Sequence, residues 1–174
     1  MSGVFVCETP RLFVRRLDAD DDAAFLLQLL NEPSFLENIG DRGVRSLDDA
    51  RAYVAKGPAA SYAQHGFGLF HVSLKDTREP IGLCGLLKRD WLEHVDIGFA
   101  YLPQYFGKGY GFEAARAVVD WGRREKGIQR VCGITKLDNV GSIRVLEKLG
   151  MTFEGMVTSP EGLVSKLFLQ PRGE

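Results

Sequence analysis

Three glycines, Gly107, Gly109 and Gly111, fall within five residues where a strand-like run gives way to a helix-like one. Glycine inside a helix costs about 0.5–1 kcal/mol relative to alanine, so the cluster needs a compensating use. A glycine-rich turn into a helix directs several backbone N–H groups at one point, and the helix N-terminus adds partial positive charge. We therefore predict a loop that binds a phosphate or pyrophosphate, with Lys108 adding a charge. The alternative is a flexible turn that only begins a helix.

The glycine segment differs from two common nucleotide-binding motifs. It is not G-x-x-x-x-G-K-[ST], which disfavours a P-loop nucleoside triphosphatase. It is also not a G-x-G-x-x-G motif after a first strand, which disfavours a dinucleotide-binding fold. A different kind of nucleotide-phosphate binder stays open.

The strand before the glycines must position the loop. Residues 93–102 alternate, which predicts a strand with two distinct faces. One face carries Val95, Ile97, Phe99 and Tyr101, and the other carries Asp96, Gly98 and Ala100.

The rest of the chain supplies further strands and helices. Residues 11–17 predict a first strand, 18–31 a helix capped by acids, and 46–57 a helix with Ser46 as its N-cap. The stretch 31–44 is mixed and predicts irregular structure, and 58–66 a turn. Strand-like runs follow His65, and residues 139–150 predict a helix stopped by Gly150. The pattern indicates an α+β class: one domain over 1–174, with a mixed, mostly antiparallel sheet.

Composition excludes several classes of protein. The net charge of −1 over 174 residues argues against a nucleic-acid partner. Cys7, Cys84 and Cys132 form no disulfide or zinc pattern, and the three histidines lack metal-ligand spacing. Cys84 and Cys132 lie in strand-like runs and are expected to be small buried hydrophobes. No apolar run of 18 residues and no leader occur, so we expect a soluble, cytoplasmic protein that binds neither metal nor membrane.

Three blocks of sequence resemble one family. Residues 104–109, QYFGKG, match the Q/R-x-x-G-x-G/A signature of the GNAT acyltransferases. Three longer blocks resemble, in the same order, blocks of the RimJ/RimL-like subgroup, which is similar to ribosomal-protein N-terminal acetyltransferases. The blocks are ETPRLFVRRL near the N-terminus, VDIGFAYLPQYFGKGYGFEA and DNVGSIRVLEKLGM. The resemblance extends from about Glu8 to Leu169.

The resemblance implies a fold and a cofactor site. It implies a central sheet of about seven strands with helices on both faces. It implies acetyl-CoA as donor, with its pyrophosphate on the loop amides and its pantetheine arm beside Ile97–Phe99, whose amides polarise the thioester carbonyl. The implied cofactor-binding residues are Ile97, Gly98, Phe99, Gln104, Tyr105, Phe106, Gly107, Lys108, Gly109, Tyr110, Gly111 and Asn139.

Two side chains are predicted to do chemistry. We predict that Asp96 receives the amine's proton through water; alternatively it binds the cationic amine at the cleft rim or is a plain polar strand residue. Many family members carry a tyrosine acid seven residues after the helix asparagine, where this chain has Leu146. Some members of the subgroup use a serine three residues after the asparagine instead, so the resemblance implies that Ser142 hydrogen-bonds the leaving sulfur; alternatively it faces the cofactor arm or bonds its own helix. Asn139 could serve equally as an N-cap.

The resemblance implies an N-acetyltransferase that works through a ternary complex, since no cysteine is placed to carry an acyl group. A catalytically silent acyl-CoA-binding regulatory module is the alternative. The acceptor is a small-molecule amine or a protein N-terminus, and a homodimer is left open. Candidates for the acceptor pocket lie near residues 38–45 and 159–162 and include Phe35, Glu37, Tyr53 and Tyr62.

Overall fold

Eight strands form one sheet in the computed structural model, which describes residues 3–172. The strand order is β1-β2-β3-β4-β5-β6-β8-β7, and only the β5–β6 pair is parallel. The predicted mixed, mostly antiparallel α+β sheet is confirmed. The eighth strand is β1, which the sequence did not predict. The strands are β1 (Phe5–Glu8), β2 (Leu12–Arg16), β3 (Leu69–Leu74), β4 (Pro80–Leu87), β5 (Val95–Tyr101), β6 (Val131–Thr135), β7 (Thr152–Thr158) and β8 (Val164–Leu169).

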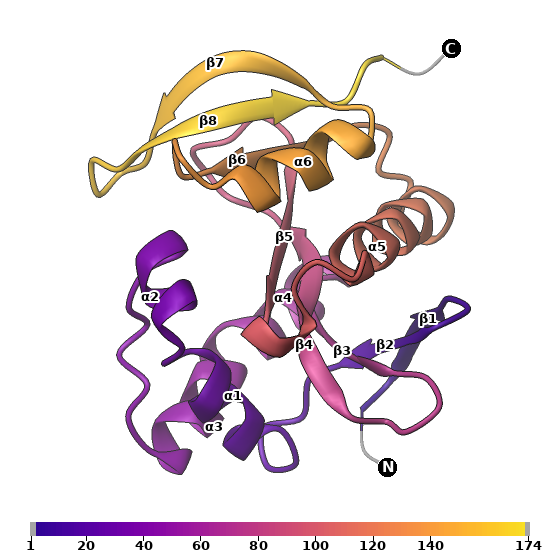
Figure 1. The fold of residues 1–174 in the computed structure, drawn as a ribbon, viewed down its shortest axis with the longest axis vertical. Coiled ribbons are helices and arrows are strands. Elements are labelled where there is room, and N and C mark those ends of the chain that lie inside the picture. Colours follow the sequence, from indigo (N-terminus) through magenta and orange to yellow (C-terminus); the bar gives the residue numbers. More distant parts are fainter. Residues whose placement is uncertain (1–2, 173–174) are drawn as a thin grey trace.

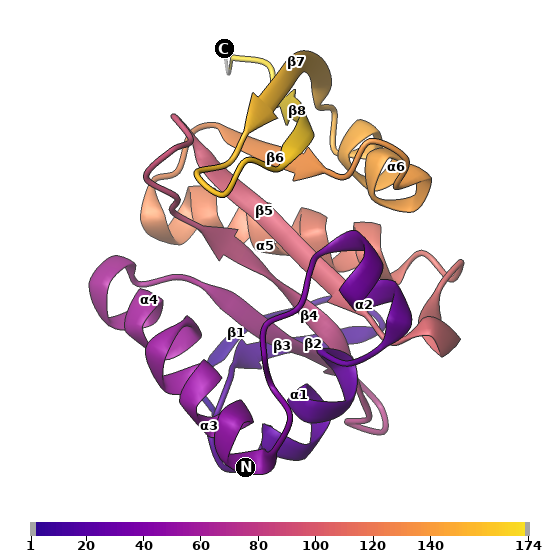
Figure 2. The same ribbon diagram turned by 90° about the vertical axis from the view of Figure 1, so that its left-hand side faces the viewer.

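Helices cover both faces of the sheet, as expected. Figure 2 shows α1 to α4 on the near face and α5 behind the sheet. Figure 1 shows α6 beside β6, β7 and β8. The helices are α1 (Ala23–Leu29), α2 (Pro33–Asn38), α3 (Leu47–Lys56), α4 (Pro58–His65), α5 (Tyr110–Lys126) and α6 (Val140–Lys148), and a 3-10 turn, η1, spans Pro103–Tyr105.

Two segments are more helical than predicted. The stretch 31–44, predicted to be irregular, contains α2, which begins with Pro33 in its first turn. The stretch 58–66, predicted to be a turn, forms α4 and ends at Gly66 with φ +78°. In both, proline starts a helix that is too short to show a clear hydrophobic period.

The predicted acid cap of α1 works differently in the structure. Asp22 is the N-cap residue, but its side chain makes no capping hydrogen bond. Its carboxylate instead accepts two hydrogen bonds from Arg15 on β2, at 2.8 and 2.9 Å. Asp18 accepts the amides of Asp20 and Asp21 and so shapes the turn before the helix. The buried Arg15–Asp22 pair therefore ties α1 to the sheet.

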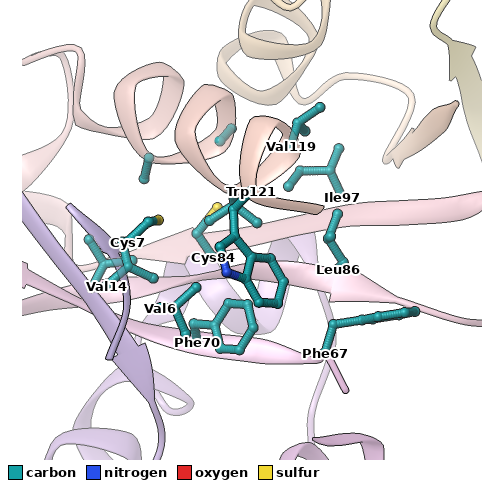
Figure 3. Close-up of a cluster of buried hydrophobic side chains, with 14 of the residues drawn as sticks. Val6, Cys7, Val14, Phe67, Phe70, Cys84, Leu86, Ile97, Val119 and Trp121 are labelled. Atoms are coloured by element: carbon teal, nitrogen blue, oxygen red, sulfur yellow. The ribbon is translucent and has the colours of Figure 1, made fainter. Parts of the chain in front are cut away.

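The core lies in two layers, one on each face of the sheet. Between the sheet and α5, Trp121 meets Phe70 edge-on with ring centroids 5.3 Å apart, near Cys84 (Figure 3). The opposite layer packs Leu26, Leu29 and α3 against Leu83 of β4. All three cysteines are buried and free, and burial raises the pKa of Cys7 to about 11. Cys84 and Cys132 are small buried residues, as predicted, and Cys7 is buried as well.

Over residues 3–172, none of the helices has the length and apolar content needed to cross a membrane.

Candidate functional site

Strands β5 and β6 separate soon after they meet. Their pairing is limited to Val95 with Val131 and Asp96 with Cys132. From Ile97 to Tyr101, β5 pairs with β4 but, within the described chain, not with β6. The backbone edge of β5 in this opening is therefore available to a ligand that carries amide groups.

The glycine loop lies at the end of this strand. Gly107 and Gly109 have φ values of +74° and +82°, in the left-handed region that glycine adopts without strain. Gly109 is the N-cap of α5, and no side chain in the described residues caps the first amides of that helix. Those amides are the donors that an anion would use. Gly111 differs, because its φ is not positive and it lies in the first turn of α5, where a Cβ would make ordinary contacts.

One cavity of about 510 Å³ joins the loop, the open edge of β5 and the helix α6. Among the predicted site residues, its lining includes Phe99, Tyr105, Phe106, Gly107, Gly109, Tyr110, Gly111, Asn139 and Ser142. Two widely separated parts of the prediction, the loop and the α6 residues, therefore meet at one place.

The remaining predicted residues are not in the cavity lining. Ile97 is buried in the core beneath α5, and Gly98 lies against Leu87. Gln104 and Lys108 are exposed, and the Lys108 carbonyl accepts a hydrogen bond from Arg11. Backbone contact with a ligand stays a prediction for these positions.

Asn139 and Ser142 open helix α6 on the cavity wall. Asn139 is the N-cap, and its Oδ1 accepts the Ser142 amide at 3.2 Å. The capping interpretation is therefore correct, and the side chain of Asn139 still borders the cavity. Leu146, which occupies the family's tyrosine position, is buried against Gly133, so this position holds a core residue.

Asp96 lies beside the opening but not in the cavity lining. Its side chain is 2 % exposed, and Arg89 Nε donates to its Oδ2 at 3.0 Å, while Oδ1 has no partner in the described residues. Burial raises the pKa of this carboxyl to about 6, although Arg89 and the Ile134 amide act to lower it. Asp96 is thus buried and paired with Arg89 rather than exposed at the cleft rim, and its role as a base stays a prediction.

Sequence reasoning identified parts of two walls of the cavity and missed other residues on each. From α6, Arg144 and Lys148 line it, and they are its only charged lining residues within the described chain. They are one helical turn apart, a spacing visible in the sequence but equally typical of a solvated helix face. From α2 and its C-cap, the lining includes Ser34, which was not predicted, and Asn38 and Ile39, which fall in the segment 38–45 expected to form the acceptor pocket. The helix α2 was itself not predicted, so its face could not be identified.

Of the four candidates for the acceptor pocket, one lines the cavity and three do not. Phe35 lines the cavity, while Glu37 is exposed outside it. Tyr53 lines a separate hollow beside α3, and residues 159–162 do not line the cavity. The Tyr62 hydroxyl donates to the Leu69 carbonyl and accepts the Leu17 amide, so it joins α4 to the sheet.

No group of three His, Cys, Asp or Glu side chains able to hold a metal ion occurs in residues 3–172.

Comparison with known proteins identifies relatives over most of the chain. The model of the acetyltransferase (GNAT) domain family matches residues 11–152. An uncharacterized N-acetyltransferase of Bacillus subtilis, YnaD, is 30 % identical over 84 % of this chain and 82 % of its own length.

Two solved structures show the same fold at low identity. The ribosomal-protein-S5-alanine acetyltransferase of Vibrio fischeri has a TM-score of 0.79 and 18 % identity, covering 98 % of both chains. The aminoglycoside acetyltransferase AAC(6′)-Ib, solved with coenzyme A, has a TM-score of 0.75 and 24 % identity, covering 92 % of this chain and 95 % of that one. The family match and the YnaD relationship confirm the predicted enzyme class, an acetyl-CoA-dependent N-acetyltransferase. The chain belongs to the GNAT acetyltransferase family.

Proposed function

We propose that this protein transfers an acetyl group from acetyl-CoA to a primary amine by direct attack within a ternary complex. One observation carries the proposal: the open edge of β5 and the amide-rich N-terminus of α5 border a single cavity. Coenzyme A has a diphosphate next to an arm with two amide groups, so one molecule would use both features. The aminoglycoside acetyltransferase solved with coenzyme A has the same fold.

The charge of the cavity suits this donor. Its charged lining residues within the described chain, Arg144 and Lys148, are both cations, and coenzyme A is a polyanion. The diphosphate would lie on the amides at the start of α5, where the helix dipole is also favourable. The two α6 cations would add electrostatic attraction from the facing wall.

The chemistry needs a neutral amine, a polarised carbonyl and a stabilised thiolate. The amine nitrogen forms a bond to the thioester carbon, and an amide of the open β5 edge stabilises the resulting oxyanion. The C–S bond then breaks, and the Ser142 hydroxyl donates a hydrogen bond to the departing sulfur. The amine's proton passes through water to Asp96, whose pKa of about 6 leaves it mostly ionised at pH 7.

The acceptor would approach from the α2 wall. Ser34, Asn38 and Ile39 supply a hydroxyl, an amide and an apolar surface there. No carboxylate lines the cavity within the described chain, so the site offers no counter-charge for a polycation. The proposed acceptor is therefore a small amine or a protein N-terminus that carries few positive charges, unlike an aminoglycoside.

The test combines binding with turnover. Isothermal titration with coenzyme A is expected to show binding, and acetyl-CoA mixed with a panel of amines is expected to release free thiol. Binding without thiol release from any amine would indicate the silent acyl-CoA-binding module instead. Absence of binding, together with a rise in melting temperature on adding a nucleoside triphosphate, would favour a nucleotide-phosphate binder and reject the proposal.

A further inference from the structure

Arg11 reaches the glycine loop from the segment between β1 and β2. Its Nη1 donates to the Lys108 carbonyl at 3.0 Å, and its guanidinium carbon lies 4.5 Å from the centre of the Tyr110 ring. A Cβ on Gly109 would be only 3.3 Å from its Nη2. Arg11 therefore contacts Lys108 and Tyr110 and lies next to Gly109 between them, although 97 positions separate Arg11 from Lys108.

The same arginine is held by an acid in the first turn of α5. Arg11 Nε donates to Glu113 Oε1 at 2.7 Å, and the Arg11 amide donates to Oε2 at 3.2 Å. The Thr9 hydroxyl also donates to Oε2. Partial burial would raise the pKa of Glu113, but the hydrogen bonds from Thr9 and Arg11 outweigh it and hold the pKa below its usual value. Glu113 is therefore a carboxylate at neutral pH.

These contacts bear on the direction of one amide. In a trans peptide, the carbonyl of one residue and the N–H of the next point in opposite directions. By holding the Lys108 carbonyl, Arg11 fixes the direction of the Gly109 N–H, and Gly109 lines the cavity. Gly107 and Gly109 give the loop conformational freedom, so a peptide plane between them needs such an external restraint.

The contacts also bear on the charge near the loop. A carboxylate in the first turn of a helix is favourable for an empty helix, but it repels an anion bound at the same end. The guanidinium of Arg11 lies between Glu113 and the loop and offsets this repulsion.

We propose that Arg11 is a positioning residue for the diphosphate of the donor, acting through the Lys108 carbonyl and through Glu113. This inference rests on the proposed use of coenzyme A. It assigns a role in donor binding to a residue outside the cavity lining and far from the loop in sequence.

The test compares Arg11→Gln with wild type in steady-state kinetics and in titration with coenzyme A. We expect the Kd for coenzyme A and the KM for acetyl-CoA to rise about tenfold, with kcat at saturating donor retained. Acetyl-pantetheine, which lacks the diphosphate, is expected to react with unchanged kcat/KM. The control is Arg116→Gln, which removes an exposed charge on α5, the helix that carries Glu113. This variant should leave the Kd, KM and kcat unchanged.

Two further variants separate positioning from general stability. Arg11→Gln/Glu113→Gln should recover part of the lost affinity, because no carboxylate is then left unpaired near the diphosphate. Arg11→Lys should be intermediate, because it keeps the charge without the fork of donors. Equal losses with acetyl-CoA and acetyl-pantetheine, or unchanged affinity in Arg11→Gln, would overturn the inference. If wild type itself fails to bind coenzyme A, the proposed function fails instead.

Discussion

Asp96 on β5 and Cys132 on β6 face each other and form the last pair before these two parallel strands separate. The carboxylate of Asp96 is therefore buried at the point where the sheet opens, hydrogen-bonded to Arg89. A single buried residue thus combines a position at the opening of the sheet with a raised pKa.

The first prediction concerns the pH dependence of turnover. Because the pKa of Asp96 is about 6, kcat/KM should fall below that pH by about tenfold per pH unit as the base becomes protonated. Asp96→Asn should lower the rate at pH 8 by about 10²-fold or more and remove this inflection. Asp90→Asn, on the exposed segment nearby, is the control. Unchanged turnover of Asp96→Asn across pH 6–9 would exclude the role.

The second prediction concerns the leaving sulfur. Ser142→Ala should lower kcat by about tenfold to a hundredfold, because a hydrogen bond to a charged group contributes about 1.5–3 kcal/mol. The Kd for coenzyme A should change little, and Ser142→Thr, which keeps the hydroxyl, should restore most of the rate. A Ser142→Ala enzyme with wild-type kcat would show that the serine only borders the cavity.

The third prediction tests the glycine loop. Gly109→Val places a β-branched residue at φ +82° and should weaken coenzyme A binding by at least about tenfold, because the amides at the start of α5 are displaced. Gly127→Val is the matched control, since Gly127 is the C-cap of the same helix with φ +67°. Both variants should lose about 1–2 kcal/mol of stability from the strained backbone. Only the first should lose affinity, and equal affinities in titration would contradict the loop assignment.

The fourth prediction concerns the α6 cations. Arg144→Gln/Lys148→Gln should weaken coenzyme A binding by about twofold to thirtyfold, since exposed charges contribute about 0.2–1 kcal/mol each. The difference from wild type should shrink as salt is raised. Arg123→Gln/Arg124→Gln at the far end of α5 removes the same charge away from the cavity and should have no such effect. A loss that is independent of salt would contradict an electrostatic role.

The fifth prediction concerns stability against pH. Burial, assisted by Arg15, lowers the pKa of His71 to about 4, so between about pH 4 and 6.5 the unfolded state binds the extra proton and stability rises with pH. Burial raises the pKa of Asp96 to about 6, so between about pH 4 and 6 the folded state holds the extra proton and stability falls with pH. These contributions oppose each other in the wild-type protein.

Replacing either His71 or Asp96 should therefore reveal the contribution of the other to the pH dependence of stability. Urea unfolding of His71→Gln between pH 4 and 6 should show stability that decreases with pH relative to wild type, and Asp96→Asn should show the reverse. Each change in slope should approach about 1.4 kcal/mol per pH unit. His65→Gln, at the end of α4, serves as the control. If the plots of stability against pH are parallel for the wild type and all three variants, burial of His71 and of Asp96 does not affect proton binding.

Local sequence patterns predicted the strands and helices that are long enough to show a period. The alternation around Ile97 was visible for that reason, whereas the glycine loop was visible from its composition. The four residues of β1 and the six of α2 are too few to establish a period, so both were missed.

The candidate site was predictable where one segment carries it and not where distant segments meet. Asn139 and Ser142 were found through a motif, whereas Ser34 reaches the cavity only through the packing of α2. Asp96 is buried beside Arg89 and β6, and the sequence around Asp96 alone does not predict this burial. The contact between Arg11 and Lys108 likewise spans 97 positions and exists only in the folded chain.

That long span has a consequence during synthesis. At about 5–20 residues per second, a ribosome needs roughly 5–20 s to add the residues between Arg11 and its loop partner. During that time the first strands are present without α5. The α6 residues that line the cavity are synthesised later still. The cavity proposed to bind the donor is thus one of the last features to form, and a nascent chain that stops short of α6 lacks one of its walls.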